Sequence, residues 1–236
     1  MKRKKNKKLP LWSKILIIFV SIIIVFIVIG IVGYTNYLYS NRNIISNVYA
    51  IRNDRNNIPM VNFFLFRTGE KFIAIDAGSD IIQTQKALNK LNISPNDIIA
   101  VFITHFHFDH IDSLSLFENA IIYTGNTENM NCVRCICEFP DIPHQILSEG
   151  QIIEINDVKI QVFDTPGHTS SCVTYLINNK YLFVGDLLVS PNMARYDSEL
   201  QIMNRERMLK IDTVEYVFTG HFGLFKRINM FRRLWL

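Results

Sequence analysis

Four side chains that commonly bind metal ions lie within six residues, directly after an apolar run. Residues 104–110 read THFHFDH, and three of the six histidines of the chain fall inside this segment. Residues 98–103 before it are all apolar and predict a buried strand. Polar side chains that follow a strand end can converge without disrupting the core. The sequence therefore predicts a metal site at this strand end, with four candidate ligands: His105, His107, Asp109 and His110.

Three more side chains of the same kind follow predicted strands further along the chain. His168, Asp186 and His221 each come just past a strand end and next to a glycine. Glycine lets the backbone approach its neighbours closely. Each of these residues alone would more often be an ordinary turn residue, but with the first four they form a convergent set. Imidazole suits Zn²⁺, Fe or Mn, and carboxylates add charge neutralisation. We expect divalent metal ions, with Zn²⁺ preferred and Fe or Mn as alternatives.

The order of the predicted elements favours two sheets covered by helices. Strand-like runs occur at 48–52, 61–67, 71–76, 98–103, 120–123, 151–155, 159–163, 172–177, 181–184 and 214–218. Asn178 and Asn179 predict a hairpin turn between two of them. Helices are predicted at 80–92, near Asp112 or Ser113, at 197–209 and after Gly223. Because the helices must cover the outer faces of two packed sheets, the predicted fold class is α/β, a four-layer αββα sandwich.

This pattern resembles the metallo-β-lactamase fold superfamily of hydrolases, which shares an H-x-H-x-D-H motif followed by separate His, Asp and His ligands. The resemblance covers residues 48–225, and all seven ligand positions are filled. It implies two metal ions. His105, His107 and His168 would hold one ion, Asp109, His110 and His221 would hold the second, and Asp186 would bridge both.

The resemblance also concerns residues around the ligands. Asp76 matches an aspartate that orients the motif loop through a hydrogen bond and does not itself bind the metal. Asp112 stands where many members have Gly, so the helix start after the motif is expected to differ. His144 matches nothing in the family pattern and is interpreted as a surface or lid residue. We hypothesise that residues 125–150 form part of the pocket rim.

The activity that the resemblance implies is hydrolysis. A hydroxide that bridges two metal ions would attack an ester, thioester or lactone carbonyl, with Asp109 orienting the nucleophile or moving its proton. β-Lactams are disfavoured, because members that open them generally lack a bridging Asp at the position of Asp186. The ligand set is closer to glyoxalase II-like thioesterases and lactonases. Three alternatives stay open: a phosphodiesterase of the same fold, an iron-dependent persulfide-type oxygenase, and a non-enzymatic membrane protein with a metal site.

An uncharged apolar run near the N-terminus predicts a transmembrane helix. The run at 15–32 is long enough to cross a bilayer as a helix, which takes ~18–20 residues. A signal peptide usually has a shorter apolar region of ~7–15 residues and a small-residue cleavage site, which does not follow here. Seven basic residues precede the run and only Arg42 lies close behind it, which predicts a cytoplasmic N-terminus. We expect a single-pass protein of the cell membrane with its catalytic domain outside: a basic tail at 1–14, an anchor at 15–34, a linker at 35–46 and a metallo-hydrolase domain at 47–236.

Net charge and cysteine content indicate which binding partners and which further metal sites this sequence favours. The net charge is +4, and leaving out the seven basic residues before the apolar run makes it negative. The basic balance therefore does not indicate nucleic-acid binding, and the expected partner is a small-molecule substrate. Cys132, Cys135 and Cys137 resemble half of a zinc site, but the second C-x₂-C pair of a Cys₄ site is missing. A loop disulfide or free thiols are favoured for these residues and for Cys172.

Overall fold

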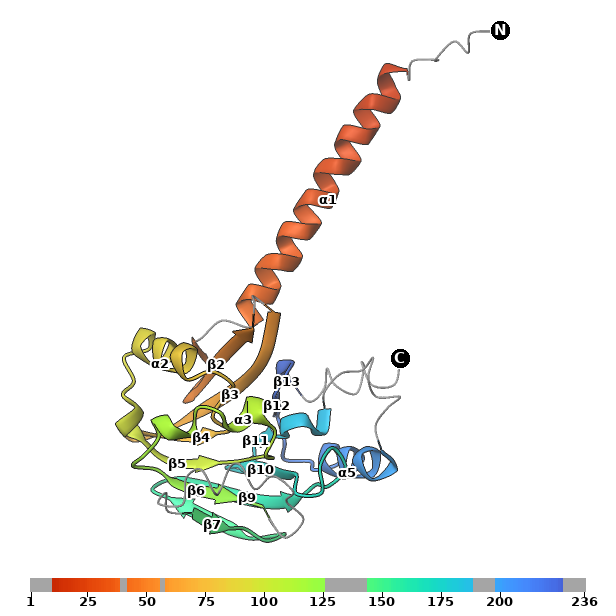
Figure 1. The fold of residues 1–236 in the computed structure, drawn as a ribbon. Helices are drawn as coiled ribbons and strands as arrows, with labels where there is room; N and C mark the ends of the chain where they lie inside the picture. The colour runs from red at the N-terminus through yellow and green to blue at the C-terminus, as the bar shows by residue number, and fades with distance from the viewer. Residues whose placement is uncertain (1–9, 39–41, 56–57, 126–143, 189–197, 227–236) are drawn as a thin grey trace, which may run out of the picture. The chain divides into compact units, whose positions relative to one another are not determined.

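The computed structural model describes residues 10–38, 42–55, 58–125, 144–188 and 198–226. The chain divides into two compact units, Met1–Leu38 and Tyr39–Leu236. The second unit contains two sheets and all seven candidate ligands (Figure 1). Each unit is described by itself below.

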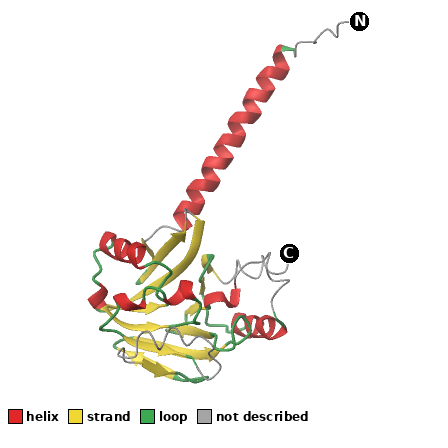
Figure 2. Cartoon of the chain, viewed as in Figure 1, coloured by secondary structure: helices red, strands yellow, loops and turns green. Residues whose placement is uncertain are grey.

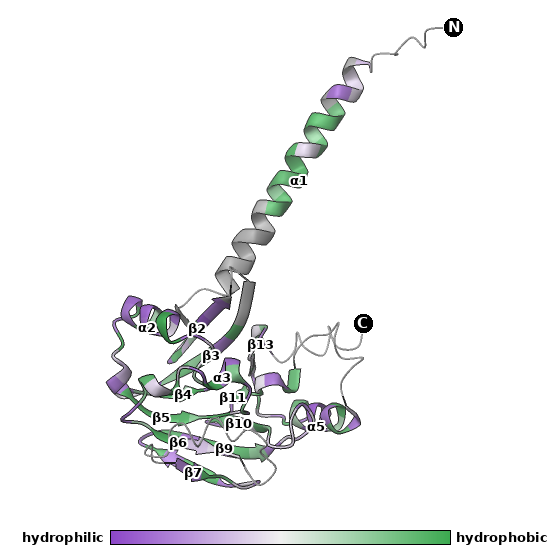
Figure 3. Cartoon of the chain, viewed as in Figure 1, coloured by the Kyte–Doolittle hydropathy of each residue, from purple (hydrophilic) through white to green (hydrophobic). Residues whose placement is uncertain are grey.

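The first unit contains one long helix, α1 (Leu11–Leu38). Side chains are described for residues 12–14 and 16–28, and the large apolar ones between Leu16 and Val28 are exposed. Most of the coloured part of α1 is hydrophobic in Figure 3. Within the described part of the chain, no helix meets the combined length and hydropathy that crossing a membrane requires. The range 35–46, predicted as a linker, contains the end of α1 and also strand β1 (Arg42–Ile45).

The first sheet carries the motif loop and, among the described residues, has seven strands in the order β1-β2-β3-β4-β5-β6-β7. The first four strands pair antiparallel, and β4 to β7 pair in parallel. The strands are β1 (Arg42–Ile45), β2 (Val48–Arg55), β3 (Ile58–Thr68), β4 (Lys71–Ile75), β5 (Ile98–Phe102), β6 (Ile121–Thr124) and β7 (His144–Ile146). Because β4 and β5 are parallel neighbours, the residues that follow them meet at one edge, and Asp76 N donates to Phe102 O at 2.9 Å.

The second sheet supplies the other ligands and, within the described residues, has six strands in the order β13-β12-β11-β10-β9-β8. They are β8 (Ile152–Ile155), β9 (Val158–Asp164), β10 (Val173–Ile177), β11 (Tyr181–Phe183), β12 (Tyr216–Thr219) and β13 (Gly223–Lys226). The predicted turn between β10 and β11 is confirmed. Asn178 and Asn179 have φ of 49° and 53°, the left-handed values that a type I′ hairpin needs.

Helices cover the outer face of each sheet, and this confirms the four-layer arrangement. Among the described residues, the helices of this unit are α2 (Ile81–Lys90), α3 (Phe108–Ile111) and α5 (Glu199–Leu209), with short 3₁₀ segments η1 (Pro95–Asp97), η2 (Leu114–Leu116) and η3 (Gly185–Leu188). Leu88 of α2 packs in one apolar cluster with β3, β4 and β5, and Met208 of α5 packs in another with β10, β11 and β12. A third cluster fills the space between the sheets with rings such as Phe102 and Phe183. Figure 2 shows helices on different sides of the strands.

Two of the predicted helices need correction. The helix predicted after Gly223 is wrong for the described residues, because Gly223–Lys226 is strand β13 paired antiparallel to β12. The chain reverses there, with Phe222 N donating to Thr219 Oγ1 at 2.9 Å, and Leu224 packs against the core between the sheets. The helix predicted near Asp112 begins earlier, at Phe108, and Asp112 is its C-cap.

Candidate metal centre

The motif residues lie on a short extended segment followed directly by a helix. β5 ends at Phe102, and α3 starts at Phe108 with His107 as its N-cap residue. Phe106 is buried in the cluster beneath α2, so His105 and His107 on either side of it point away from that cluster. His105 and His110 are buried, whereas His107 is exposed. Alternation and the helix start therefore bring all four motif side chains to one place.

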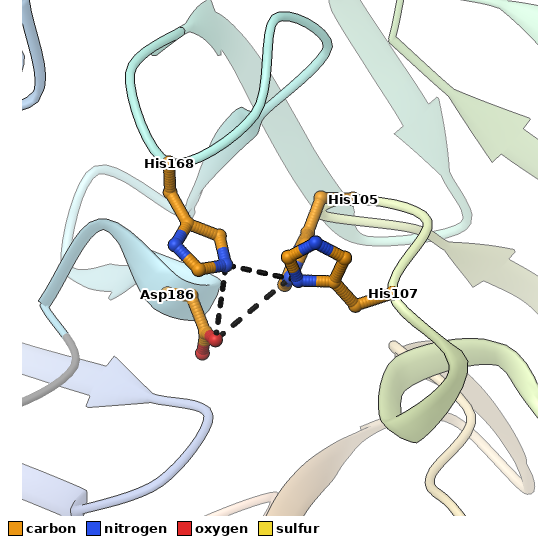
Figure 4. Close-up of side chains that lie close together, drawn as sticks. All are labelled: His105, His107, His168 and Asp186. Carbon is orange, nitrogen blue, oxygen red and sulfur yellow. Dashed lines mark hydrogen bonds and ion pairs between the residues drawn. The ribbon is translucent and has the colours of Figure 1, made fainter. Parts of the chain in front are cut away.

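His105, His107, His168 and Asp186 form the first group of candidate ligands, and their ligand atoms all lie within 4.8 Å of one another. His107 Nδ1 lies 3.1 Å from His105 Nε2 and 3.0 Å from His168 Nε2. His168 Nε2 lies 3.4 Å from Asp186 Oδ2. Figure 4 shows the four side chains pointing toward one another.

Asp109, His110 and His221 form the second group, within the same 4.8 Å limit. Asp109 Oδ2 lies 3.7 Å from His221 Nε2 and 3.9 Å from His110 Nε2. Asp186 reaches this group as well, since its Oδ2 lies 3.0 Å from His221 Nε2 and its Oδ1 lies 3.5 Å from His110 Nε2. The structure thus brings together all seven residues that the sequence singled out and places the Asp186 carboxylate between the two groups.

The polar atoms inside this cluster fit divalent metal ions better than they fit one another. His110 Nε2 and Asp186 Oδ1 are buried and make no hydrogen bond. A buried polar atom without a partner is costly unless something else satisfies it. Three ring nitrogens also face one another at His105, His107 and His168, and a cation would satisfy all three.

Asp76 organises both groups, as the predicted orienting role requires. Its Oδ2 accepts from His110 Nδ1 at 2.8 Å and from Thr104 Oγ1 at 2.9 Å, and its Oδ1 accepts from Thr104 N at 2.7 Å. Thr104 Oγ1 also lies 3.1 Å from His105 Nδ1. Because this hydroxyl donates to Asp76, its oxygen accepts the His105 Nδ1 proton. In this assignment both His105 and His110 present an Nε2 lone pair to a metal ion.

Burial and the neighbouring charged groups shift the pKa values of the residues in the cluster. Burial lowers the pKa of His105 well below its usual value, with His110 adding to the effect, and burial also lowers the pKa of His168. Burial opposes charge on His110 too, but Asp76 raises its pKa well above the usual value. Burial opposes ionisation of Asp186, yet His110 and His221 hold its pKa well below the usual range. The lowered pKa values of Asp186, His105 and His168 favour the ionised carboxylate and neutral imidazoles that a divalent cation needs, whereas His110 would release a proton when a cation binds.

Thr104 and Asn62 position ligand segments and were not singled out by the sequence reasoning. Thr104 could have been found from its place between the strand and the first ligand. Asn62 gave no local signal. It is buried in β3, and its N and Nδ2 donate to Gly220 O at 2.6 and 3.1 Å, which fixes the backbone before His221.

The remaining sequence predictions fall around the site or outside the described residues. His144 is exposed in β7, as a surface residue should be, and it does not belong to either ligand group. Cys172 is a buried free thiol. Residues 126–143, which include Cys132, Cys135 and Cys137 and most of the proposed pocket rim, lie outside the described residues.

Comparison with known proteins identifies related chains. Residues 56–125 match the family model of the metallo-beta-lactamase superfamily. A probable metallo-hydrolase of Methanocaldococcus jannaschii is 31% identical over 150 residues, covering 59% of this chain and 64% of that protein. A hydroxyacylglutathione hydrolase of Glaesserella parasuis is 29% identical over 52% of this chain and 50% of its own length. The acyl-coenzyme A thioesterase MBLAC2 of Gallus gallus is 24% identical over 72% of this chain and 76% of its own length. The chain thus spans less than two thirds of the first two relatives.

Solved structures agree on the fold. A metallo-beta-lactamase family protein from Thermus thermophilus aligns with a TM-score of 0.60 at 18% identity, covering 80% of this chain and 77% of that one. The segment that matches the family model, residues 56–125, includes the four motif ligands. This chain has the metallo-β-lactamase fold, and residues 56–125 are similar in sequence to the metallo-beta-lactamase superfamily.

Proposed function

We propose that this chain is a binuclear metal-dependent hydrolase. The observation that carries the proposal is the buried carboxylate of Asp186, which faces histidines of both ligand groups. His105, His107 and His168 would hold one metal ion, Asp109, His110 and His221 the other, and Asp186 would bridge them. The ligand types suit Zn²⁺, with Fe or Mn as alternatives. Two bound ions would lower the pKa of a shared water and polarise the carbonyl of the substrate.

The protein's own groups have distinct tasks in this proposal. His105 and His110 form the closed side of the cluster, since both side chains are fully buried. His168 and His221 each leave 23% of the side chain exposed, so the substrate would approach from their side. Asp109 would orient the nucleophile and hold its proton, since its carboxylate is 11% exposed beside His221. Asp76 would keep the ring nitrogens in their ligand form.

We favour a thioester as the bond that is cut, among the ester, thioester and lactone classes. Relatives of this chain are named hydroxyacylglutathione hydrolase and acyl-coenzyme A thioesterase, and both names denote thioester substrates. The bridging position of Asp186 supports the same choice over a β-lactam.

The test uses the full chain, purified in mild detergent, and two histidine variants. Metal content is measured first, and hydrolysis is then followed on thioesters, esters, lactones, a phosphodiester and a β-lactam. His107→Ala should lose at least a hundredfold in kcat/KM, whereas His144→Ala, at the histidine outside both ligand groups, should keep the activity of the unmodified chain. Phosphodiester cleavage without thioester cleavage would replace the proposed substrate class. Stoichiometric iron at a single position would favour the oxygenase alternative.

We also propose that the apolar run at 15–32 anchors the chain in the cell membrane, with the basic N-terminus inside and the domain outside. The uncharged length of the run and the seven basic residues before it support this arrangement. The chain should stay with carbonate-washed membranes, and protease added to intact cells should digest the domain. A variant with Ile23→Arg and Ile24→Arg is the control, because charges in the middle of the run oppose insertion. Full recovery of the unmodified chain in the soluble fraction would refute the anchor.

A further inference from the structure

Helix α5 and its N-cap carry four polar side chains at every third position, and each donates to a backbone carbonyl of a ligand-bearing segment. Ser198 Oγ donates to Gly167 O at 3.2 Å and Asn204 Nδ2 to Pro166 O at 2.8 Å. Gln201 Nε2 donates to Asp186 O at 3.2 Å, and Arg207 Nη2 to Asp164 O at 2.6 Å. Residues three apart form one ridge along a helix surface. We call this set the α5 ridge: Ser198, Gln201, Asn204 and Arg207.

The carbonyls that the α5 ridge binds belong to two separate ligand segments. Asp164, Pro166 and Gly167 lead from the end of β9 to His168, and Asp186 lies in η3 after β11. These segments lie far apart in the sequence, and His168 Nε2 comes within 3.4 Å of Asp186 Oδ2. The ridge therefore ties together the backbones from which the two ligands project.

The contact at Gly167 is a direct approach of backbone to backbone. A Cβ placed on Gly167 would lie 2.5 Å from Gln201 Cα and 2.6 Å from Gln201 N. Gly167 has φ of 148°, a conformation that residues with side chains rarely adopt. The start of α5 is thus fixed against the residue next to His168 with no side chain between them.

Burial separates these amides from ordinary surface residues. Gln201 and Asn204 are 4% and 5% exposed, although Gln and Asn are mostly exposed in proteins. A buried amide is costly unless its hydrogen bonds are made. The core-packing residues of α5 are Met208 and Leu209, at the other end of the helix. The two buried amides lie before them on the helix and make hydrogen bonds that apolar side chains could not supply.

We infer that Gln201 and Asn204 are positioning residues that set the placement of His168 relative to Asp186 and thereby the metal affinity of the site. This inference rests on the proposed metal-dependent function. Neither residue touches the substrate; each acts through the backbone of a ligand segment. Residues that orient metal ligands typically contribute about 10–100-fold to metal affinity. We expect a loss of about tenfold when either amide is removed.

The test is a Co²⁺ titration of the full metal-free chain, followed through the visible absorption of the bound ion. Gln201→Met and Asn204→Leu keep the approximate size of each side chain and remove the donor. Each should raise the dissociation constant of Co²⁺ about tenfold and change the visible band, since ligand geometry changes. The melting temperature without metal is measured on every variant.

Matched controls separate ligand positioning from a general loss of stability. Gln83→Met removes a part-buried amide that bonds to the backbone of Asp54 in β2, a strand that carries no candidate ligand. Met203→Gln changes an exposed residue of α5 between the two amides. Both controls should bind Co²⁺ within twofold of the unmodified chain. If Gln201→Met does not fold, Ser198→Ala and Ser198→Thr replace it. Thr retains the hydroxyl that bonds Gly167 O and should restore the affinity that Ala loses.

The outcomes are distinct. Weaker binding in both amide variants, with unchanged controls, supports the inference. Unchanged binding in the amide variants overturns it, and so does an equal loss in Gln83→Met. If the unmodified chain binds no Co²⁺, the proposed metal function fails together with the inference, and this result differs from a chain that binds Co²⁺ regardless of the ridge.

Discussion

Asp76→Asn tests whether Asp76 sets the tautomers of His105 and His110. The substitution replaces one carboxylate oxygen by an NH₂ group. Asn tolerates the left-handed backbone of this position, where φ is 63°, about as well as Asp. Its Oδ1 can still accept from Thr104 N, but an NH₂ group replaces Oδ2. That group donates, so the proton of His110 Nδ1 loses its acceptor. Because the amide also donates to Thr104 Oγ1, the Thr104 hydroxyl proton turns toward His105 Nδ1. In both histidines the proton then moves to Nε2, the atom that would bind the metal.

The expected magnitudes differ for binding and for folding. Metal affinity should fall about 10–100-fold in each of the two groups, because an orienting partner is lost in each. Two hydrogen bonds to a buried charged acceptor are worth about 1.5–3 kcal/mol each, but the amide makes replacements. We therefore expect the free energy of unfolding of the metal-free chain to fall by only about 1–3 kcal/mol.

Zinc competition titration and urea unfolding with chelator present measure the two quantities. Asp97→Asn is the matched control, since the Asp97 carboxylate is exposed, bonds to Lys71 and lies in η1. It should leave zinc affinity unchanged. If Asp76→Asn bound two zinc ions within twofold of the unmodified affinity, the proposed tautomer control would be refuted.

Three further substitutions or treatments probe the same region. Gly220→Ala should lose at least tenfold in zinc affinity, because the added Cβ would lie 2.7 Å from Asp186 Oδ1; full zinc content at equal affinity would contradict this. Burial raises the pKa of Cys172 from 9.0 to about 11, so its thiol should resist alkylation at pH 8 until the chain is unfolded. As the pH rises, the Cys172 thiol loses its proton in the unfolded chain before it does so in the folded chain. The free energy of unfolding should therefore fall as the pH rises from 9 through 11, and this fall should be smaller in Cys172→Ala. Tyr175→Phe removes the hydroxyl that donates to Ile103 O at 2.6 Å and should cost about 1–3 kcal/mol in urea unfolding. An unchanged urea midpoint in Tyr175→Phe would argue against that bond.

The parts of the fold that were predictable from sequence have strong local signals. Apolar runs indicated β5 and β10, and the Asn178-Asn179 pair indicated the turn between β10 and β11. The short strands β1, β7 and β13 were not predicted, because a short edge strand is determined by the neighbour with which it pairs. The segment after Gly223 illustrates this. A helix was predicted there, but the segment pairs with the edge of β12 as strand β13.

The candidate site was more predictable for ligands than for the residues that hold them. His105, His107 and the other ligands carry their chemistry in their residue type and lie at strand ends. Asn62, Gln201 and Asn204 act on backbone carbonyls far away in the sequence, and an amide in a helix or strand gives no sign of such a partner. Such residues become visible only when burial and hydrogen-bond partners are known.

The three ligands outside the motif share a feature that explains how distant strand ends can supply one site. A glycine precedes each of them, and at each one a Cβ would collide with another part of the site. Gly185 packs against the Thr104 side chain, Gly220 against Asp186 and His110, and Gly167 against Gln201. Ligands that bind one ion must approach within a few ångströms of each other, so the backbones behind them must also come close. A glycine before each of these ligands therefore allows the strand ends to come close enough for one site. Alanine at any of these glycine positions should move a ligand.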